Sequence, residues 1–255
     1  MSTNPGISKT TARPTGGVAA IASLDLVSAT LEQLSSRRTG VTGIGVLYGP
    51  SGWGKTFATN VLANEHRAYY VQMRSAWRSK DLLRKILVEM GVKEGRGTTS
   101  GLLDMVAAQL SESRRTLIID EFDYATNSDT LIELTRDIYE ASQGSLLLVG
   151  EEQLPRKLEK PEWERLHNRV SAWAQMQAVS LEDADKLAQI YCPGINLTEE
   201  VLAKLVAQSK GAVRRVVNCL NAIYEHGQLY AMDTVDAEIL AGIRLPSGRA
   251  PERRV

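Results

Sequence analysis

The stretch GPSGWGKT, Gly49 to Thr56, decides the fold of this chain. It reads as a glycine, four residues and then Gly-Lys-Thr, which is the pattern of a phosphate-binding loop. The apolar run Ile44–Tyr48 before it predicts a buried strand, and the segment Thr56–Glu65 after it suits a helix. The motif therefore stands in the strand, loop and helix context that it requires, and it predicts a nucleotide-binding site.

Each residue type in this loop has a physical task. Glycines allow backbone angles and a close approach that side chains would block. The N–H groups of the loop and of the following helix then face an anion. Lys55 is expected to place its charge on the phosphates of ATP, and the Thr56 hydroxyl is expected to bind Mg²⁺. The predicted nucleotide-binding residues of the loop are Gly49, Pro50, Ser51, Gly52, Trp53, Gly54, Lys55 and Thr56.

The composition is that of a globular protein with a sizeable core. The chain has 255 residues, of which 43% are hydrophobic and 24% are charged, enough for one large domain or two modest ones. Thirty basic residues balance thirty acidic ones, which argues against a uniformly basic nucleic-acid binder but not against a local basic patch. Cys192 and Cys219 lack metal-ligand spacing and are expected to be reduced core thiols. No apolar run reaches membrane-spanning length and no signal-peptide core is present, so a cytoplasmic protein is expected.

Apolar runs alternate with helical patterns as far as Val179, which predicts an α/β fold with a parallel sheet covered by helices on both faces. Strands are expected at Ile44–Tyr48, Ala68–Met73, Thr116–Asp120, Ser145–Val149 and Gln175–Val179. Helices are expected at Ser23–Arg37, Thr56–Glu65, Ser79–Met90, Ser100–Ser111 and Ser128–Ser142, with shorter pieces near Glu152–Glu159 and Pro161–Asn168.

Beyond Val179 the pattern predicts helices only, in a small bundle. They are expected at Leu181–Tyr191, from Thr198 to about Ser209, at Gly211–Tyr230 and at Asp233–Ala241. The expected organisation is a flexible tail at residues 1–17, an α/β domain at 18–180, the helical bundle at 181–242 and a basic C-terminal tail at 243–255.

A second site follows the third expected strand, which ends in the paired acids Asp120 and Glu121. In an open parallel sheet, ligands sit outside the carboxyl ends of the strands. Asp120 is expected to join Thr56 in holding Mg²⁺ beside the nucleotide. Glu121 is expected to orient or deprotonate the attacking water. A solvated strand end is the alternative for an isolated pair of acids, and the neighbouring phosphate loop disfavours it.

With these motifs the chain resembles the AAA+ ATPases over roughly residues 17–242. The resemblance rests on GPSGWGKT, on LIIDEFD at Leu117–Asp123, on the five strand and helix units and on the helices that follow. It implies a P-loop NTPase fold of the AAA+ type, with a five-stranded parallel sheet sandwiched by helices and a small C-terminal helical lid. It also implies an enzyme that uses Mg²⁺ and converts ATP and water to ADP and phosphate.

Within that superfamily, three stretches are similar to the ATPases of DNA transposition, namely the B protein of Mu-like phages and the related transposon regulator TnsC. The stretches are LLLVGEEQL at Leu146–Leu154, RLHNRV at Arg165–Val170 and GAVRRVVNCLNAI at Gly211–Ile223. The similarity implies non-sequence-specific binding to duplex DNA, assembly into rings or helical filaments, and target selection with delivery to a transposase. Two alternatives stay open: a helicase-loader or secretion-type ATPase acting on a protein partner, and a nucleotide-gated scaffold with little hydrolysis.

The resemblance gives roles to three further positions. Arg169 matches the arginine finger that reaches a neighbouring subunit's nucleotide, with Arg165 as its substitute, and a planar guanidinium suits that task. Arg214 matches the second sensor of the lid, held over the γ-phosphate. The first sensor falls near Glu151, which is unusual because an ionised carboxylate cannot donate a hydrogen bond.

Basic side chains interleaved with aromatic ones give a candidate DNA face. The aromatic residues are Tyr69, Tyr70 and Trp77, and the candidate DNA contacts are Arg74, Arg78, Lys80, Lys93, Arg96, Thr98 and Thr99. Such side chains can bind phosphates without reading the base sequence. In the resembling transposition ATPases this part of the domain lines the DNA-facing side of a filament. The alternative is a solvated helix face with Trp77 in the core, and both interpretations stay open.

Overall fold

The computed structural model describes residues 17–38, 40–92 and 97–246, and these divide into two compact units. The first unit contains Ile21–Val179 and Gly211–Arg214, and the second contains residues 17–20, Ser180–Lys210 and residues 215–246. Residues 211–214, expected within the lid, therefore cluster with the first unit. Of the expected tails, residues 1–16 and 247–255 lie outside the described residues.

The first unit is built around a five-stranded sheet with the order β2-β3-β4-β1-β5, in which every pair of neighbours is parallel. This confirms the expected fold class. The strands are β1 Ile44–Gly49, β2 Tyr69–Gln72, β3 Leu117–Asp120, β4 Leu146–Glu151 and β5 Val170–Gln175. The inner strands β1, β3 and β4 are buried along almost their whole length, as continuous apolar strands are when both faces of a sheet are covered.

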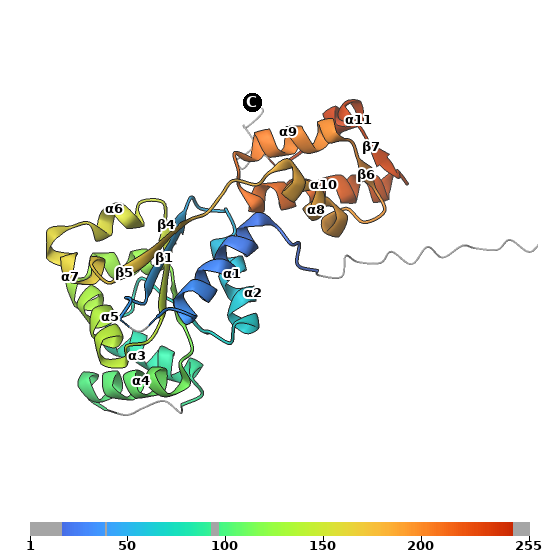
Figure 1. The fold of residues 1–255 in the computed structure, drawn as a ribbon. Helices are drawn as coiled ribbons and strands as arrows, with labels where there is room; N and C mark the ends of the chain where they lie inside the picture. The colour runs from blue at the N-terminus through green and yellow to red at the C-terminus, as the bar shows by residue number, and fades with distance from the viewer. Residues whose placement is uncertain (1–16, 39, 93–96, 247–255) are drawn as a thin grey trace, which may run out of the picture. The chain divides into compact units, whose positions relative to one another are not determined.

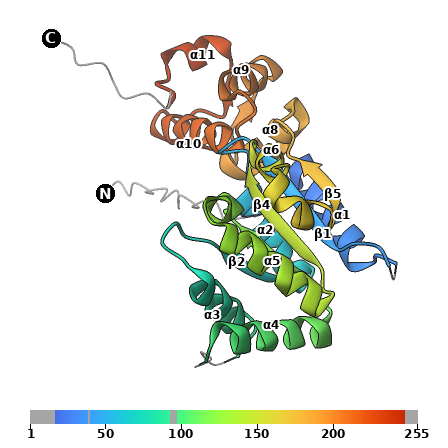
Figure 2. The ribbon, with the colours of Figure 1, turned by 90° about the vertical axis from the view of Figure 1, so that its left-hand side faces the viewer.

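Helices cover both faces of this sheet (Figures 1 and 2). Helices α1 and α2 pack together on one face, while α3, α4 and α5 pack together on the other. The longer helices are α1 Ala22–Ser35, α2 Lys55–Glu65, α3 Ser79–Glu89, α4 Thr99–Ser113 and α5 Asp129–Ser142. Short helical segments complete the unit: η1 Phe122–Asn127, α6 Leu154–Leu158, η2 Pro161–Trp163 and α7 Glu164–His167.

The expectation of a fifth strand at Gln175–Val179 is wrong, because β5 ends where that strand was expected to begin. This strand lies at the edge of the sheet and its side chains alternate, with Ala172 and Ala174 buried and the residues between and beside them exposed. An alternating edge strand has no continuous apolar run to reveal it. The apolar run that follows packs on the phosphate loop instead: a Cβ added at Gly49 would lie 2.8 Å from the Cβ of Met176.

The second unit is a small helical bundle with one short pair of strands. Its helices are α8 Leu181–Tyr191, α9 Glu199–Ser209, α10 Val213–Leu229, whose first two residues belong to the first unit, and α11 Ala237–Gly242. Strands β6 Asn196–Leu197 and β7 Thr234–Val235 pair in parallel, so the expectation of helices only is wrong here. Two-residue strands carry too little pattern to be read from sequence. Cys192 and Cys219 are buried free thiols, as expected. None of the helices in the described residues has the length and apolarity to cross a membrane.

Candidate nucleotide site

The phosphate loop, residues 49–54, connects the carboxyl end of β1 with α2. Gly52 and Gly54 have φ angles of 82° and 91°, in the left-handed region that favours glycine. Gly54 is the N-cap of α2, and no side chain of the described residues caps this helix end. The first N–H groups of the helix are therefore available to an anion. Pro50, Ser51 and Trp53 are carried by the same loop, as predicted.

Lys55 places its amine at the mouth of this loop. Its Nζ donates hydrogen bonds to the carbonyl oxygens of Gly49 and Pro50, at 2.6 and 3.0 Å. Burial lowers the pKa of Lys55, while the carboxylates of Glu151, Asp120, Glu121 and Asp123 act in the opposite direction. The ammonium group thus lies between the loop and a group of acids. A phosphate fits this position, because its oxygens can replace the two loop carbonyls as acceptors.

Asp120 and Glu121 lie beside the loop at the carboxyl end of β3, where the sequence predicted them. Asp120 is only 1% exposed, and its Oδ1 accepts a hydrogen bond from the Glu121 N–H at 2.8 Å. Glu121 has a φ of 55°, a left-handed conformation that is uncommon for glutamate and that concentrates at functional sites. Burial, followed by the charges of Asp120 and Glu151, raises the pKa of Glu121. A raised pKa makes this carboxylate a better proton acceptor, which suits activation of a water.

Asp123, the third acid of LIIDEFD, holds the end of β4 in place. Its Oδ2 accepts a hydrogen bond from the Glu151 N–H at 2.6 Å, and its Oδ1 accepts one from Lys157 Nζ at 2.8 Å. A Cβ added at Gly150 would collide with that Oδ2 and with a methyl group of Leu154, so these side chains would have to shift. Sequence reasoning missed Asp123 and Lys157 because their partners lie 28 and 34 positions away. The sequence did offer a signal, because Asp123 is a third acid close to Asp120 and Glu121 in the stretch LIIDEFD.

Glu151, the position expected for the first sensor, closes β4 opposite Gly49. Its side chain is exposed, and its charge opposes the lowering of the Lys55 pKa and contributes to the raised pKa of Glu121. Since an ionised carboxylate cannot donate a hydrogen bond, what Glu151 contributes to this site is negative charge.

The segment 211–214 returns to the phosphate loop. The Arg214 N–H donates a hydrogen bond to the Gly52 carbonyl oxygen at 3.1 Å. Gly211 has a φ of 81°, and a Cβ added there would lie 2.6 Å from the Cβ of Ala178 and 2.9 Å from the Trp53 ring. Glycine therefore permits this close approach. The Arg214 side chain is exposed beside the loop, in a position compatible with the expected second sensor.

Arg169 lies at the amino ends of the strands, whereas the phosphate loop lies at their carboxyl ends. Its carbonyl oxygen accepts a hydrogen bond from the N–H of Ile44, the first residue of β1, whereas the loop follows the last residue. At about 3.3 Å per residue, the strand between them is roughly 16–20 Å long. The Arg169 side chain therefore does not reach a nucleotide on the loop of its own chain. The substitute Arg165 is exposed on α7.

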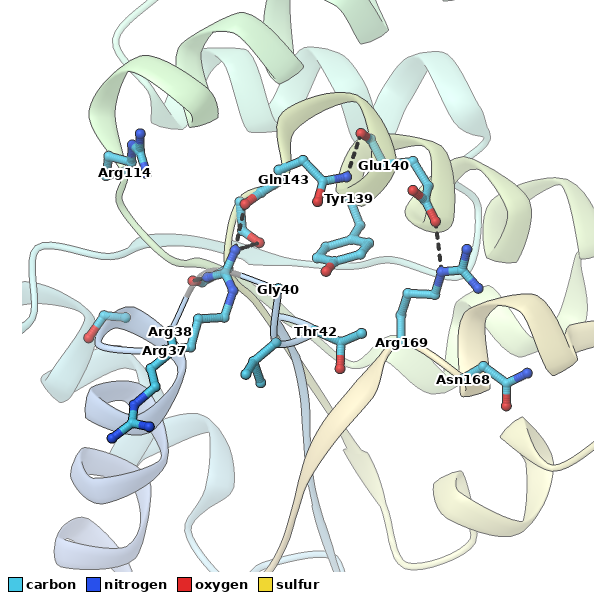
Figure 3. Close-up of a pocket in the computed structure, with 14 residues that line it drawn as sticks. Arg37, Arg38, Gly40, Thr42, Arg114, Tyr139, Glu140, Gln143, Asn168 and Arg169 are labelled. Atoms are coloured by element: carbon cyan, nitrogen blue, oxygen red, sulfur yellow. Dashed lines mark hydrogen bonds and ion pairs between the residues drawn. The ribbon is translucent and has the colours of Figure 1, made fainter.

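Arg169 lines a polar pocket of about 490 Å³ at this amino edge of the sheet (Figure 3). Its Nε donates a hydrogen bond to Glu140 Oε1 at 2.7 Å, a contact that sequence reasoning missed because Glu140 lies on α5, 29 residues away. Arg37, which also lines the pocket, has a structural task. Its guanidinium donates to the carbonyl oxygen of Gly144 at 3.0 Å and to Ser145 Oγ, which ties the end of α1 to the segment before β4.

The candidate DNA contacts near β2 are exposed. Arg74 and Arg78 lie on the segment between β2 and α3, and Lys80 lies in the first turn of α3. The Arg74 guanidinium lies 6.0 Å from the centroid of the Trp77 ring, which itself packs partly against the core. Trp77 thus supports the segment, and the cations next to it face solvent.

The second set of candidate DNA contacts lies before and at the start of α4. Thr98 has a structural task, because its Oγ1 accepts a hydrogen bond from the Gly101 N–H at 3.2 Å and caps this helix. Thr99 is the first residue of α4. Lys93 and Arg96 lie outside the described residues.

Comparisons with known proteins agree with this geometry. Residues 37–158 match the family model described as an AAA domain. No curated protein matches the chain in sequence.

Several solved structures share the fold at low sequence identity. The Aeropyrum pernix ORC2 protein in its ADPNP-ADP complexes is 15% identical, with a TM-score of 0.62 over 86% of this chain and 66% of that one. The Aeropyrum pernix ORC1 protein in complex with DNA is 19% identical, with a TM-score of 0.58 over 87% of this chain and 63% of that one. The chain thus spans less than two thirds of both ORC proteins.

The Thermotoga maritima RuvB Holliday junction branch migration motor is 16% identical, with a TM-score of 0.58 over 87% of this chain and 68% of that one. At such identities the similarity concerns the fold alone. Together with the phosphate loop, the strand order and the AAA domain match, it leads to one conclusion: the chain has the P-loop fold of the AAA+ ATPases.

Proposed function

We propose that this protein is an ATP-dependent, non-sequence-specific DNA-binding ATPase that assembles into rings or filaments on duplex DNA. The observation that carries the ATPase activity is the meeting of Lys55, Asp120 and Glu121 at the carboxyl edge of the sheet. Lys55 would hold the phosphates of ATP, and Glu121 would accept a proton from the attacking water. The water's oxygen would then bond to the γ-phosphorus as the bond to ADP breaks.

The donor set beside the loop fits magnesium. The Thr56 hydroxyl and the Asp120 carboxylate supply hard oxygen ligands, which Mg²⁺ prefers together with phosphates and water. In the described part of the chain, no group of three or more His, Cys, Asp or Glu side chains is placed to hold a metal. A cation shared between two side chains and a nucleotide suits that arrangement. When bound, it would neutralise charge on the phosphates.

Assembly is supported by the position of Arg169. Because this side chain lies one strand length away from its own phosphate loop, it could contact a nucleotide only on a second copy. Such a contact joins the surface at the amino ends of the strands in one copy to the surface at the carboxyl ends of the strands in the next. Head-to-tail contacts of this kind generate rings or helical filaments.

Binding to DNA is supported by the exposed cations Arg74, Arg78 and Lys80 and by the nature of the similar structures. One of these was solved in complex with DNA, and another is a Holliday junction branch migration motor. The finer role, target selection in DNA transposition with delivery to a transposase, rests on the three similar stretches of sequence. ATP-bound assemblies would mark the target DNA, and hydrolysis would dismantle them.

A second candidate function is favoured by Glu151. Because it places negative charge where a hydrogen-bond donor is expected, turnover could be very slow, and the protein would then act as a nucleotide-gated scaffold. ATP-driven assembly without measurable phosphate release would favour the scaffold. Hydrolysis that a protein partner stimulates and duplex DNA does not would instead favour a helicase-loader or secretion-type ATPase.

Removal of the cations near β2 should weaken DNA binding equally for all base sequences. We expect Arg74→Ala, Arg78→Ala and Lys80→Ala each to lower the slope of log affinity against log salt by roughly one unit, because each removes one phosphate contact. The measurement is DNA affinity at several salt concentrations in the presence of ATP. Arg156→Ala, an exposed cation on α6, is the matched control. If the slope is unchanged in all three variants, DNA does not contact this surface. If a variant instead loses a preference for particular bases, the altered side chain contacts bases directly.

A further inference from the structure

Tyr70 of β2 reaches across to the acid that closes β3. Its hydroxyl donates a hydrogen bond to Asp120 Oδ2 at 2.7 Å. Gln72 lies opposite Asp120 in the parallel register, and Tyr70 precedes Gln72 by two residues. The side chains of Tyr70 and Asp120 therefore point to the same face of the sheet. The side chain of Thr59 on α2 lies near the Tyr70 hydroxyl, while its own hydroxyl donates to the Lys55 carbonyl oxygen at 2.9 Å. The Tyr70 hydroxyl thus lies between the carboxylate that closes β3 and the helix that begins at Lys55 and Thr56.

The Asp120 carboxylate is held from two sides. Its Oδ2 accepts from Tyr70, and its Oδ1 accepts from the Glu121 N–H. Burial, and then the charge of Asp120, raise the pKa of Tyr70, so the hydroxyl keeps its proton and remains a donor. Two donors fix the plane of a carboxylate and leave its remaining lone pairs in defined directions.

We infer that Tyr70 is a positioning residue for magnesium at the nucleotide site. Its hydroxyl fixes the orientation of the Asp120 carboxylate relative to the start of α2, where Thr56 lies. The inference rests on the proposed function, since it requires a nucleotide on the loop. Hydrogen-bond partners behind a metal ligand orient that ligand, and their loss typically weakens metal binding 10- to 100-fold. The Tyr70 hydroxyl donates to Asp120, whereas Lys55 donates to the loop carbonyl oxygens of Gly49 and Pro50.

Tyr70→Phe tests this inference by removing one oxygen and keeping the ring. We expect the Mg²⁺ concentration for half-maximal binding of a fluorescent ATP analogue to rise about 10-fold. Binding of the same analogue in EDTA should not change, because Lys55 and the loop remain intact. Tyr69→Phe is the matched control: Tyr69 precedes Tyr70 on β2, points to the other face, and has the Arg115 guanidinium 3.9 Å from its ring centroid.

An unchanged Mg²⁺ dependence in Tyr70→Phe would overturn the inference. An equal loss of binding in Mg²⁺ and in EDTA would also overturn it, by showing that the hydroxyl supports the loop and not the cation. Combining Tyr70→Phe with Asp120→Asn gives a second measurement, in which the effect of Tyr70→Phe should vanish, and two additive effects would refute the coupling. Absence of Mg²⁺-dependent binding in the unaltered protein would instead defeat the proposed function itself, and the inference with it.

Discussion

Lys55→Ala should abolish nucleotide binding and, with it, ATP-dependent assembly. Four carboxylates act on the Lys55 amine, so its removal leaves a phosphate facing negative charge without a cation. Hydrogen bonds to charged groups contribute about 1.5–3 kcal/mol each, so we expect ATP affinity to fall by about 100-fold or more. Equilibrium binding of a fluorescent ATP analogue measures the effect.

Lys204→Ala is the control for this prediction, because Lys204 lies on α9 in the second unit and pairs with Glu200 at 3.2 Å. We expect this variant to bind ATP normally. Normal ATP affinity in Lys55→Ala would show that the loop does not hold the nucleotide.

Arg169→Ala should stop hydrolysis without affecting ATP binding, and the loss should be repaired by a second copy. An arginine finger contributes about 10³-fold or more to turnover in related phosphoryl transfers. Arg169 lies at the amino ends of the strands, away from the loop of its own chain. Mixing Arg169→Ala with Lys55→Ala should therefore restore hydrolysis at interfaces between the two variants. There, one copy supplies the lysine and the other the arginine. Phosphate release by the mixture, compared with each variant alone, is the measurement.

The exposed ion pair with Glu140 does not prevent this role. Arg169 and Glu140 are 35% and 38% exposed, and surface pairs of this kind contribute about 0–1 kcal/mol, so the guanidinium can exchange its partner. Arg156→Ala, which removes an exposed cation on α6, is the control and should keep its activity. A mixture that co-assembles and still releases no phosphate would exclude Arg169 as the finger, and Arg165 would then be tested in the same way.

The positions of the candidate nucleotide-site residues could be predicted from sequence because the motifs that carry them are local. Glycine conformations, a buried strand and a helix start all lie within the segment Ile44–Glu65, and the acids Asp120 and Glu121 directly follow another apolar strand. Parallel strands bring their carboxyl ends to one edge of a sheet, so both motifs meet there. The same reasoning gave the fold class.

The contacts that could not be predicted depend on which strands are neighbours. Tyr70 meets Asp120 across 50 positions, and Asp123 meets Glu151 across 28, because β3 lies between β2 and β4. Local pattern carries no information on that order. The fifth strand was misplaced for a related reason: at the sheet edge only one side of β5 is buried, which removes the apolar run on which the prediction relied.

The proposed ATPase activity is tested most directly by phosphate release from ATP in the presence of Mg²⁺ and duplex DNA, for the unaltered protein and for Glu121→Gln at equal amounts of bound nucleotide. We expect the unaltered protein to release phosphate. Glu121→Gln should bind ATP with similar affinity, keep its assemblies on DNA for longer, and release phosphate at least about 100-fold more slowly, because glutamine cannot accept the water's proton. Equal rates of phosphate release from the two proteins would contradict the role of Glu121.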